Sequence, residues 1–153
     1  MLSTIEKMNK IIAIACDHAG YELKETIKKF LSEKGFEIKD YGTNSSDSVD
    51  YPDMVHPLGR DINTGVYNKG IVVCGSGNGV QMTVNKYQNV RCALCWNVEI
   101  AELARMHNDA NVLSLPARFI PSELALEIVD KFISTDFEGG RHLRRVEKIK
   151  NTL

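Results

Sequence analysis

The chain has 153 residues, of which 43% are hydrophobic and 25% charged, and its formal net charge at pH 7 is −1. This length suffices for one domain with a full core, and the balanced charge argues against binding to nucleic acid or to a membrane surface. No apolar stretch approaches the ~20 residues of a membrane-spanning helix. Residues 1–10 carry no signal-peptide core, so we expect a cytoplasmic protein with reduced thiols.

Short apolar runs alternate with amphipathic segments along the chain. The apolar runs are typical of buried parallel strands, whereas the other segments repeat apolar residues at helical spacing. The first half predicts a strand at 11–15, a helix through 23–31, a strand at 36–41, a helix over 52–62, a strand at 70–74 and a helix over 80–86. The second half predicts a strand at 90–96, a helix through 100–106 with Asn97 as its N-cap, a strand at 112–115, a helix over 124–132 capped by Ser122, and a last helix over 141–150.

This alternation predicts right-handed βαβ units and therefore an α/β fold with a doubly wound parallel sheet of five strands. We expect a single domain over 1–153, with an N-terminal extension at 1–9 and a C-terminal helical segment at 140–153. In such a sheet, ligands bind where the carboxyl ends of the strands meet. Residues that follow the predicted strands are therefore the first candidates for a functional site.

Cys74 occupies such a place, because it ends the third predicted strand and opens the loop Gly75-Ser76-Gly77-Asn78-Gly79. Glycines let a backbone approach an anion closely, and the helix that follows directs free N–H groups at it. The positive end of the same helix dipole stabilises a nearby thiolate. The sequence thus predicts a thiol beside an anion-binding loop.

Other polar side chains stand next to strand ends. Asp17 and His18 follow the first predicted strand, His107 and Asn108 precede the fifth, and Arg118 follows it. We expect all of these side chains to converge with the thiol at one edge of the sheet, where a binding site is most common in this class of fold.

Arg141 and Arg145 lie four residues apart in the last predicted helix and so share one face. Two guanidinium groups on one face suit a phosphate, although such a pair is also compatible with a solvated basic face. The other candidates have plainer explanations as well. Cys74 alone is more often an ordinary buried strand residue, and Asp17 or His107 can simply stabilise a helix end.

Two further patterns argue against nucleotide or metal binding. The glycine loop is not followed by the Gly-Lys-Ser/Thr of a Walker motif, and it does not follow the first strand as a dinucleotide-binding loop does. Cys92 and Cys95 lie three residues apart in a predicted strand, so their side chains point to opposite faces and cannot share a metal or a disulfide. We expect no metal site.

In their order along the chain, the motifs resemble those of type B ribose-5-phosphate isomerase, in the sugar-phosphate isomerase family that also includes the galactose-6-phosphate isomerase subunits. The resemblance covers Ile11 to about Ile149. It rests on Cys16-Asp17-His18-Ala19-Gly20, Asp50-Tyr51-Pro52, Cys74-Gly75-Ser76-Gly77-Asn78-Gly79, Asn85-Lys86, His107-Asn108-Asp109-Ala110-Asn111-Val112-Leu113 and Glu138-Gly139-Gly140-Arg141-His142. It implies a three-layer α/β/α, Rossmann-like sandwich whose C-terminal helix reaches a dimer partner.

The resemblance implies an aldose–ketose isomerisation through a cis-enediolate, without metal or cofactor. Cys74 would be the general base that moves a proton between C1 and C2, and His107 would assist ring opening. Asp17 would bind or polarise sugar hydroxyls, and Ser76 would relay a proton to and from the substrate oxygens. A branch of the family uses a Glu in the glycine loop as its base, but Val80 stands at that position here, which favours Cys74.

The resemblance also implies which residues bind the substrate. The sugar contacts would be Tyr51 and Asn108, and the enediolate oxygen would be held by the backbone N–H groups of the loop that includes Gly75, Gly77, Asn78 and Gly79. The phosphate ligands would be His18, Arg118, Arg141 and Arg145. The family builds each site between two subunits, so that the segment from His107 and the C-terminal arginines come from the partner.

We therefore predict a homodimeric isomerase that interconverts D-ribose 5-phosphate and D-ribulose 5-phosphate in the pentose phosphate pathway. Whether dimers pair into tetramers stays open. The nearest alternative is an isomerase of a six-carbon sugar phosphate, such as allose or galactose 6-phosphate. A non-catalytic phosphate- or nucleotide-binding module of flavodoxin-like fold is another, although no Walker lysine or ribose-binding acid supports it.

Overall fold

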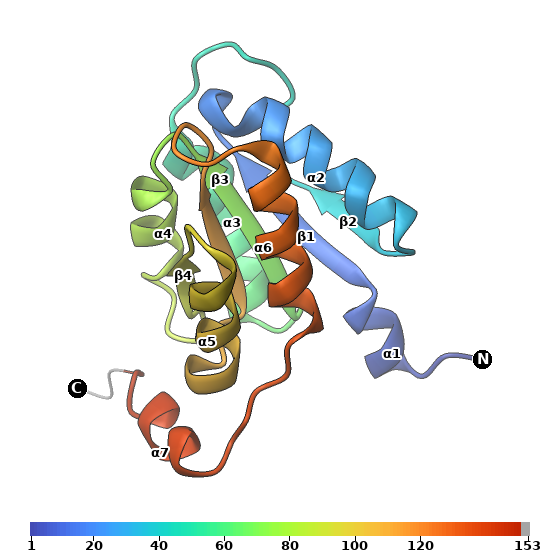
Figure 1. Ribbon diagram of the computed structural model, residues 1–153, viewed down its shortest axis with the longest axis vertical. Coiled ribbons are helices and arrows are strands. Elements are labelled where there is room, and N and C mark those ends of the chain that lie inside the picture. Colours follow the sequence, from blue (N-terminus) through green and yellow to red (C-terminus); the bar gives the residue numbers. More distant parts are fainter. Residues whose placement is uncertain (151–153) are drawn as a thin grey trace.

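Five parallel strands form one sheet in the computed structural model of the chain, which describes residues 1–150 (Figure 1). The strands are β1 (Ile11–Cys16), β2 (Glu37–Asp40), β3 (Lys69–Cys74), β4 (Cys92–Leu94) and β5 (Val112–Pro116), and they lie in the order β2-β1-β3-β5-β4. The helices are α1 (Thr4–Asn9), the short 3₁₀ helix η1 (His18–Gly20), α2 (Tyr21–Glu33), α3 (Tyr51–Asn63), α4 (Asn78–Val84), α5 (Val98–Asn108), α6 (Ser122–Ser134) and α7 (Arg141–Glu147). Among residues 1–150, no helix has the length and apolar character that a membrane crossing needs.

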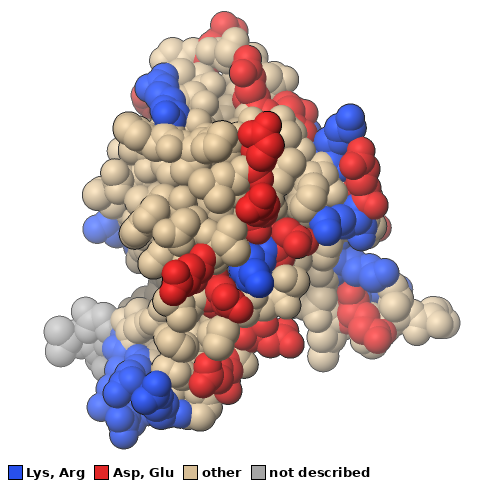
Figure 2. Space-filling model, in the orientation of Figure 1, with Lys and Arg blue, Asp and Glu red and all other residues tan. Residues whose placement is uncertain are grey.

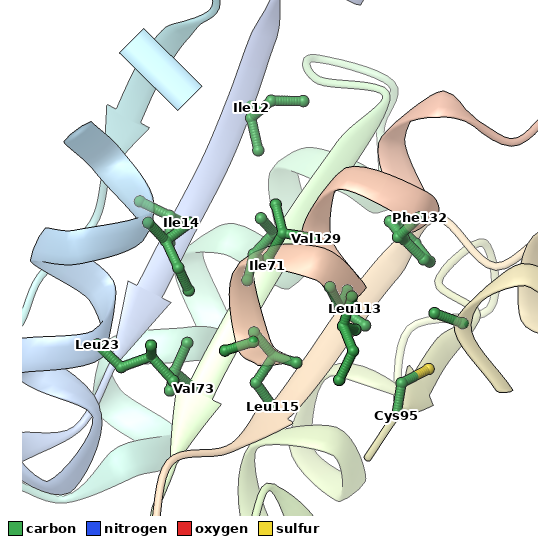
Figure 3. Packing of buried hydrophobic residues seen from close by; sticks show 14 of the residues in the cluster. Ile12, Ile14, Leu23, Ile71, Val73, Cys95, Leu113, Leu115, Val129 and Phe132 are labelled. Atoms are coloured by element: carbon green, nitrogen blue, oxygen red, sulfur yellow. The ribbon is translucent and has the colours of Figure 1, made fainter. Parts of the chain in front are cut away.

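Helices cover both faces of the sheet because the central strands are apolar on both faces. Side chains alternate along β1, so Ile12 and Ile14 point into one layer of the core while Ala13 and Ala15 point into the other. The first layer lies beneath α2, α5 and α6, and Figure 3 shows Val129 of α6 packed within it. The second layer lies beneath α3 and α4. This arrangement confirms the predicted three-layer α/β/α sandwich.

One of the two predicted helix caps is present. The Asn97 side chain accepts a hydrogen bond from the Ile100 N–H at 2.8 Å, so the predicted cap of α5 is confirmed. The prediction for α6 is wrong, because Ser122 is already the first helical residue and Pro121 takes the N-cap position. Proline fixes its own φ in a range that suits the entry to a helix, which lets α6 begin earlier than predicted.

The edge strand β4 is shorter than the predicted 90–96, because the Val90 N–H donates to the Tyr87 carbonyl in a turn instead of joining the sheet. The prediction for the two cysteines here holds, since Cys92 lies in the second core layer and Cys95 in the first. The last helix, α7, ends before the predicted residue 150. The end of the predicted C-terminal segment, 151–153, lies outside the described residues.

A buried lysine fastens α2 to β2. The Lys24 side chain is fully buried, and its Nζ lies 2.8 Å from both carboxylate oxygens of Asp40. Lys28 Nζ lies 2.8 Å from Oδ2 of the same carboxylate. Burial pushes the pKa of the Asp40 carboxyl upward, but hydrogen bonds from Lys24, Lys28 and the Gly42 N–H together outweigh it and leave the pKa lowered.

We expect Asp40→Asn to lower the free energy of unfolding at neutral pH by on the order of 3 kcal/mol, because Lys24 then keeps a buried charge without its main counter-ion. The native pKa of Asp40 is lowered, so the ion pair contributes fully above the unfolded pKa of about 3.9. Its contribution is lost as the pH falls through the native pKa. Urea unfolding at neutral pH and near pH 3 should show the gap between variant and wild type closing in acid.

Glu25→Gln is the matched control for this prediction. The Glu25 carboxylate lies 3.5 Å from Lys24 Nζ but is 42% exposed, so its removal should cost less than ~1 kcal/mol. Equal losses of stability in the two variants would contradict the assignment of Asp40 as the main counter-ion.

Candidate active site

A cavity of about 390 Å³ opens at the carboxyl ends of β1, β3 and β5. Its walls are formed by Asp17, His18, Ala19, Tyr51, Cys74, Gly75, Ser76, Gly79, Arg118 and Phe119. Except for Ala19 and Phe119, each of these residues is a predicted site residue. Their convergence at the carboxyl edge of the sheet is therefore confirmed. The sequence analysis missed Phe119. In the structure this large apolar side chain is 74% exposed and has no place in the core.

Cys74 lies at this cavity because β3 ends there. The residue is only 5% exposed, and the Gly77 N–H donates a hydrogen bond to its Sγ at 3.1 Å. Gly77 has a φ of 77°, which favours glycine and lets the loop turn back toward the sulfur. An N–H group directed at sulfur stabilises the thiolate, which is the form of cysteine that can accept a proton.

A buried hydroxyl holds this loop in place. Ser114, in the middle of β5, is fully buried, and its Oγ donates to the Gly77 carbonyl at 2.7 Å. Sequence reasoning missed Ser114 as a site residue. The signal was present, since a single hydroxyl inside an otherwise apolar strand needs a hydrogen-bond partner.

The remaining cysteines differ from Cys74 in their surroundings. All four thiols are free, but burial raises the pKa of Cys16 and of Cys95 to about 12, and burial also raises the pKa of Cys92. These three thiols stay protonated near neutral pH. Among the residues that the structure describes, Cys74 is the one cysteine at the cavity.

Two side chains pack directly on the glycine loop. A Cβ atom on Gly79 would lie 2.5 Å from the Tyr51 ring, and one on Gly75 would lie 3.3 Å from Arg118 Cδ and Nη1. The Asn78 N–H donates to Ser76 Oγ at 3.3 Å. Because the N–H groups of residues 77 and 78 already have partners, they can bind a substrate oxygen only by exchanging those hydrogen bonds.

Asp17 and His18 enter the cavity from the turn after β1. The Asp17 carboxylate is nearly buried and accepts a hydrogen bond from the Gly20 N–H at 3.1 Å, so it also caps η1. His18 Nδ1 accepts from the Val49 N–H at 3.2 Å. This bond leaves Nε2 of the neutral ring as the N–H donor, which suits an anionic ligand.

Gly20→Ala should destabilise the protein, because a Cβ atom there would lie 2.6 Å from the Val73 carbonyl oxygen, which belongs to the central strand and cannot move aside. We expect a loss of about 1–3 kcal/mol, measured as a lower midpoint of thermal or urea unfolding. Gly75→Ala is the matched control for stability, since its Cβ would meet only the exposed, flexible Arg118 side chain. A stable Gly20→Ala protein would show that the turn after β1 does not depend on this close contact.

The predicted convergence is wrong for His107 and Asn108. They end α5 just before β5, where the Asn111 carbonyl accepts from the Gly70 N–H. Cys74 lies four residues further along β3, which is about 13 Å at ~3.3 Å per residue. Residues that precede a parallel strand lie at its amino end, so the sheet holds this pair at the edge opposite the thiol. Asn108 lines a separate cavity of about 510 Å³ there.

Arg141 and Arg145 lie near the same end of the sheet as His107. They belong to α7, where Lys and Arg side chains gather at the lower left of Figure 2. The rings of His107 and His142 stack with their centroids 4.2 Å apart, which fixes α7 against the end of α5. Burial lowers the pKa of His142, and the neighbouring His107 and Arg141 lower it further, so its ring is neutral near pH 7. Within one chain, Arg141 and Arg145 therefore lie near His107 and not near Cys74.

Comparisons with known proteins agree on one family. The sequence model of the family described as "Ribose/Galactose Isomerase" matches residues 12–149. Ribose-5-phosphate isomerase B of Escherichia coli is 41% identical over 140 residues, which cover 92% of this chain and 94% of that protein.

Solved structures give the same result. A ribose 5-phosphate isomerase from Thermotoga maritima is 50% identical, with a TM-score of 0.89 over 92% of this chain and 97% of that chain. Ribose-5-phosphate isomerase B from Mycoplasma genitalium, with ribulose 5-phosphate bound, is 42% identical, with a TM-score of 0.88 over 91% of this chain and 93% of that chain. A sequence match over most of the chain thus coincides with the same fold, and the chain belongs to the ribose/galactose isomerase family.

Proposed function

We propose that the chain is an aldose–ketose isomerase that interconverts D-ribose 5-phosphate and D-ribulose 5-phosphate. The observation that carries this proposal is Cys74 at the cavity, with the Gly77 N–H directed at its sulfur. The related structure with ribulose 5-phosphate bound supports the choice of substrate. The relatives named ribose-5-phosphate isomerase B support it as well.

Cys74 is the general base in the proposed mechanism. Its thiolate takes the proton from C2 of the open-chain aldose, and the resulting thiol returns a proton to C1 of the enediolate, which gives the ketose. A positioned base contributes typically ~10²–10⁴-fold to such a step. N–H groups of the glycine loop stabilise the enediolate oxygen, and a lost donor of this kind costs on the order of 3 kcal/mol.

The other groups of the cavity hold the substrate. Ser76 carries protons between the two substrate oxygens, and Asp17 and Tyr51 bind the sugar hydroxyls. His18 and Arg118 bind the phosphate from this side of the site. Phosphate suits both, because the guanidinium group is a strong anion ligand and His18 presents Nε2 as a donor.

The site is completed by a second copy of the chain in a homodimer. In one copy, about 13 Å of β3 separates Cys74 from Gly70, which lies beside the start of β5, and His107 precedes β5 at that same end of the sheet. An acid for ring opening is therefore supplied by His107 of the partner subunit, and Asn108 of the partner subunit contacts the sugar. Arg141 of the partner subunit and Arg145 of the partner subunit bind the phosphate, which they reach from α7.

Turnover of ribose 5-phosphate in the presence of EDTA tests the proposed function. We expect conversion to ribulose 5-phosphate with EDTA present, and a kcat/KM that exceeds the values for allose 6-phosphate and galactose 6-phosphate. The six-carbon substrates belong in the experiment because the family includes galactose isomerases. A clear preference for either of them would overturn the choice of substrate. Tight phosphate or nucleotide binding without turnover would instead support the non-catalytic module.

A further inference from the structure

Two hydrogen bonds in succession lead from the middle of β5 to the sulfur of Cys74. The Ser114 hydroxyl donates to the Gly77 carbonyl at 2.7 Å, and the Gly77 N–H donates to Cys74 Sγ at 3.1 Å. Leu113 and Leu115 point into the first core layer, so the Ser114 side chain between them points to the other face of the sheet, where the loop and α4 lie. Ser114 is fully buried and therefore reaches the thiol only through the loop.

Gly77 is a point at which the loop needs an anchor. This residue takes the N-cap position of α4 with a φ of 77°, and it has no side chain that could cap the helix. Its carbonyl also accepts from the Gln81 N–H in the first turn of α4, at the longer distance of 3.3 Å. Ser114 thus makes the shorter of the two hydrogen bonds to this carbonyl and ties the start of α4 to the sheet.

The loop lies directly on the two strands beneath it. A Cβ atom on Gly77 would lie 2.5 Å from Leu94 Cδ1 in β4, 3.1 Å from Ser114 Oγ and 3.2 Å from the carbonyl carbon of Leu115 in β5. This packing leaves the Gly77 backbone little room to rotate. With its carbonyl held toward Ser114, the direction of its N–H toward the sulfur is restricted as well.

We propose that Ser114 is a positioning residue of the isomerase, which keeps the Gly77 N–H directed at Cys74 Sγ and so keeps the thiolate available as the base. The direction matters because an N–H stabilises an anion only at hydrogen-bond distance and angle. The role in turnover rests on the proposed function. The effect on the thiol does not, because it can be measured without any sugar phosphate.

The reaction of Cys74 with iodoacetamide as a function of pH tests the effect on the thiol. The thiolate is the reacting form, so the midpoint of the pH profile reports how strongly the protein stabilises it. Peptide mass spectrometry assigns the alkylation to Cys74. In Ser114→Ala we expect the midpoint to move upward by about 0.4–1 pH unit, which corresponds to the net contribution of one hydrogen bond. An unchanged midpoint would overturn the proposal.

A second pair of variants separates the hydroxyl from the volume of the side chain. Ser114→Thr and Ser114→Val add nearly the same bulk at this buried position, but only Thr keeps a hydroxyl. The midpoint in Ser114→Val should therefore lie above the midpoint in Ser114→Thr, even where both proteins are less stable than the wild type. Equal midpoints in these two variants would contradict the assignment to the hydroxyl.

Val112→Ala is the matched control for stability. Val112 is fully buried in the same strand, but it begins β5 at the end far from the loop. Its truncation should lower the midpoint of urea unfolding and leave the pH profile of Cys74 unchanged. A shift as large as that in Ser114→Ala would show that lost stability, and not the lost hydroxyl, controls the thiol.

Turnover of ribose 5-phosphate tests the catalytic role. In Ser114→Ala we expect kcat at neutral pH to fall about 2–10-fold with little change in KM, and the loss to shrink at higher pH, where the thiolate forms without this support. A raised KM with an unchanged kcat would overturn the role in catalysis. If the wild type itself turns over no sugar phosphate, the proposed function fails, and the alkylation profiles still decide whether Ser114 positions the thiol.

Discussion

Cys74→Ala is expected to lower the turnover of ribose 5-phosphate by at least ~10²–10⁴-fold while the binding of the sugar phosphate is largely retained. The substitution removes the base but leaves the loop N–H groups, His18 and Arg118 at the cavity. Exchange of the substrate C2 proton with deuterium in the solvent, followed by nuclear magnetic resonance, should be lost in parallel with turnover. Substrate binding is measured separately by calorimetry.

Cys16→Ala provides the matched control for this experiment. Cys16 ends the neighbouring strand β1 and is fully buried, and burial raises the pKa of its thiol to about 12. Its removal should leave kcat close to the wild-type value. Near-normal proton exchange in Cys74→Ala, or equal losses in the two variants, would remove Cys74 as the base.

Mixing two variants that each show little activity at low substrate concentration should restore activity if each site takes residues from two subunits. Arg141→Ala/Arg145→Ala should raise KM about 10–100-fold per arginine, because each charged hydrogen bond to phosphate contributes about 1.5–3 kcal/mol. In a heterodimer with Cys74→Ala, one of the two sites receives the intact thiol together with the intact arginines. Random pairing of equal amounts should therefore give about a quarter of the wild-type activity.

The matched control for this mixture pairs Cys74→Ala with a second change in the same half of the site, Arg118→Ala. Both residues lie at the cavity of one chain. In every dimer of these subunits, the cavity of a Cys74→Ala chain lacks the thiol, and the cavity of an Arg118→Ala chain lacks a phosphate ligand. Activity should stay far below a quarter. Native mass spectrometry shows whether heterodimers form in the first mixture. If they form and activity is not recovered, the result counts against a shared site.

The sequence was informative wherever a local pattern determines the structure. Apolar runs and glycine punctuation were sufficient to place the five strands, and the position of Cys74 directly before a glycine-rich turn predicted its location at a sheet edge. The Asn97 cap also depends only on neighbouring residues, and it was predicted correctly.

The errors arose where the outcome depends on contacts between distant segments. His107 looked like a member of the same cluster as Cys74 because both stand next to strand ends, yet the direction of a parallel sheet places them at opposite edges. The hydrogen bond from Ser114 to the Gly77 carbonyl joins residues 37 positions apart, so no short motif reveals it. The buried position of His142, whose Nε2 has no hydrogen-bond partner, depends on how α7 packs, which the sequence pattern does not specify.

Cys74 and His107 lie at opposite ends of the sheet, and this separation affects how activity depends on protein concentration. In the proposed dimer, a newly folded monomer carries a base without its acid and half of a phosphate clamp, so it is catalytically silent. Activity then requires that two chains associate. At low concentration the rate of turnover therefore grows with the square of the protein concentration. Dilution alone would switch the enzyme off, with every chain still folded.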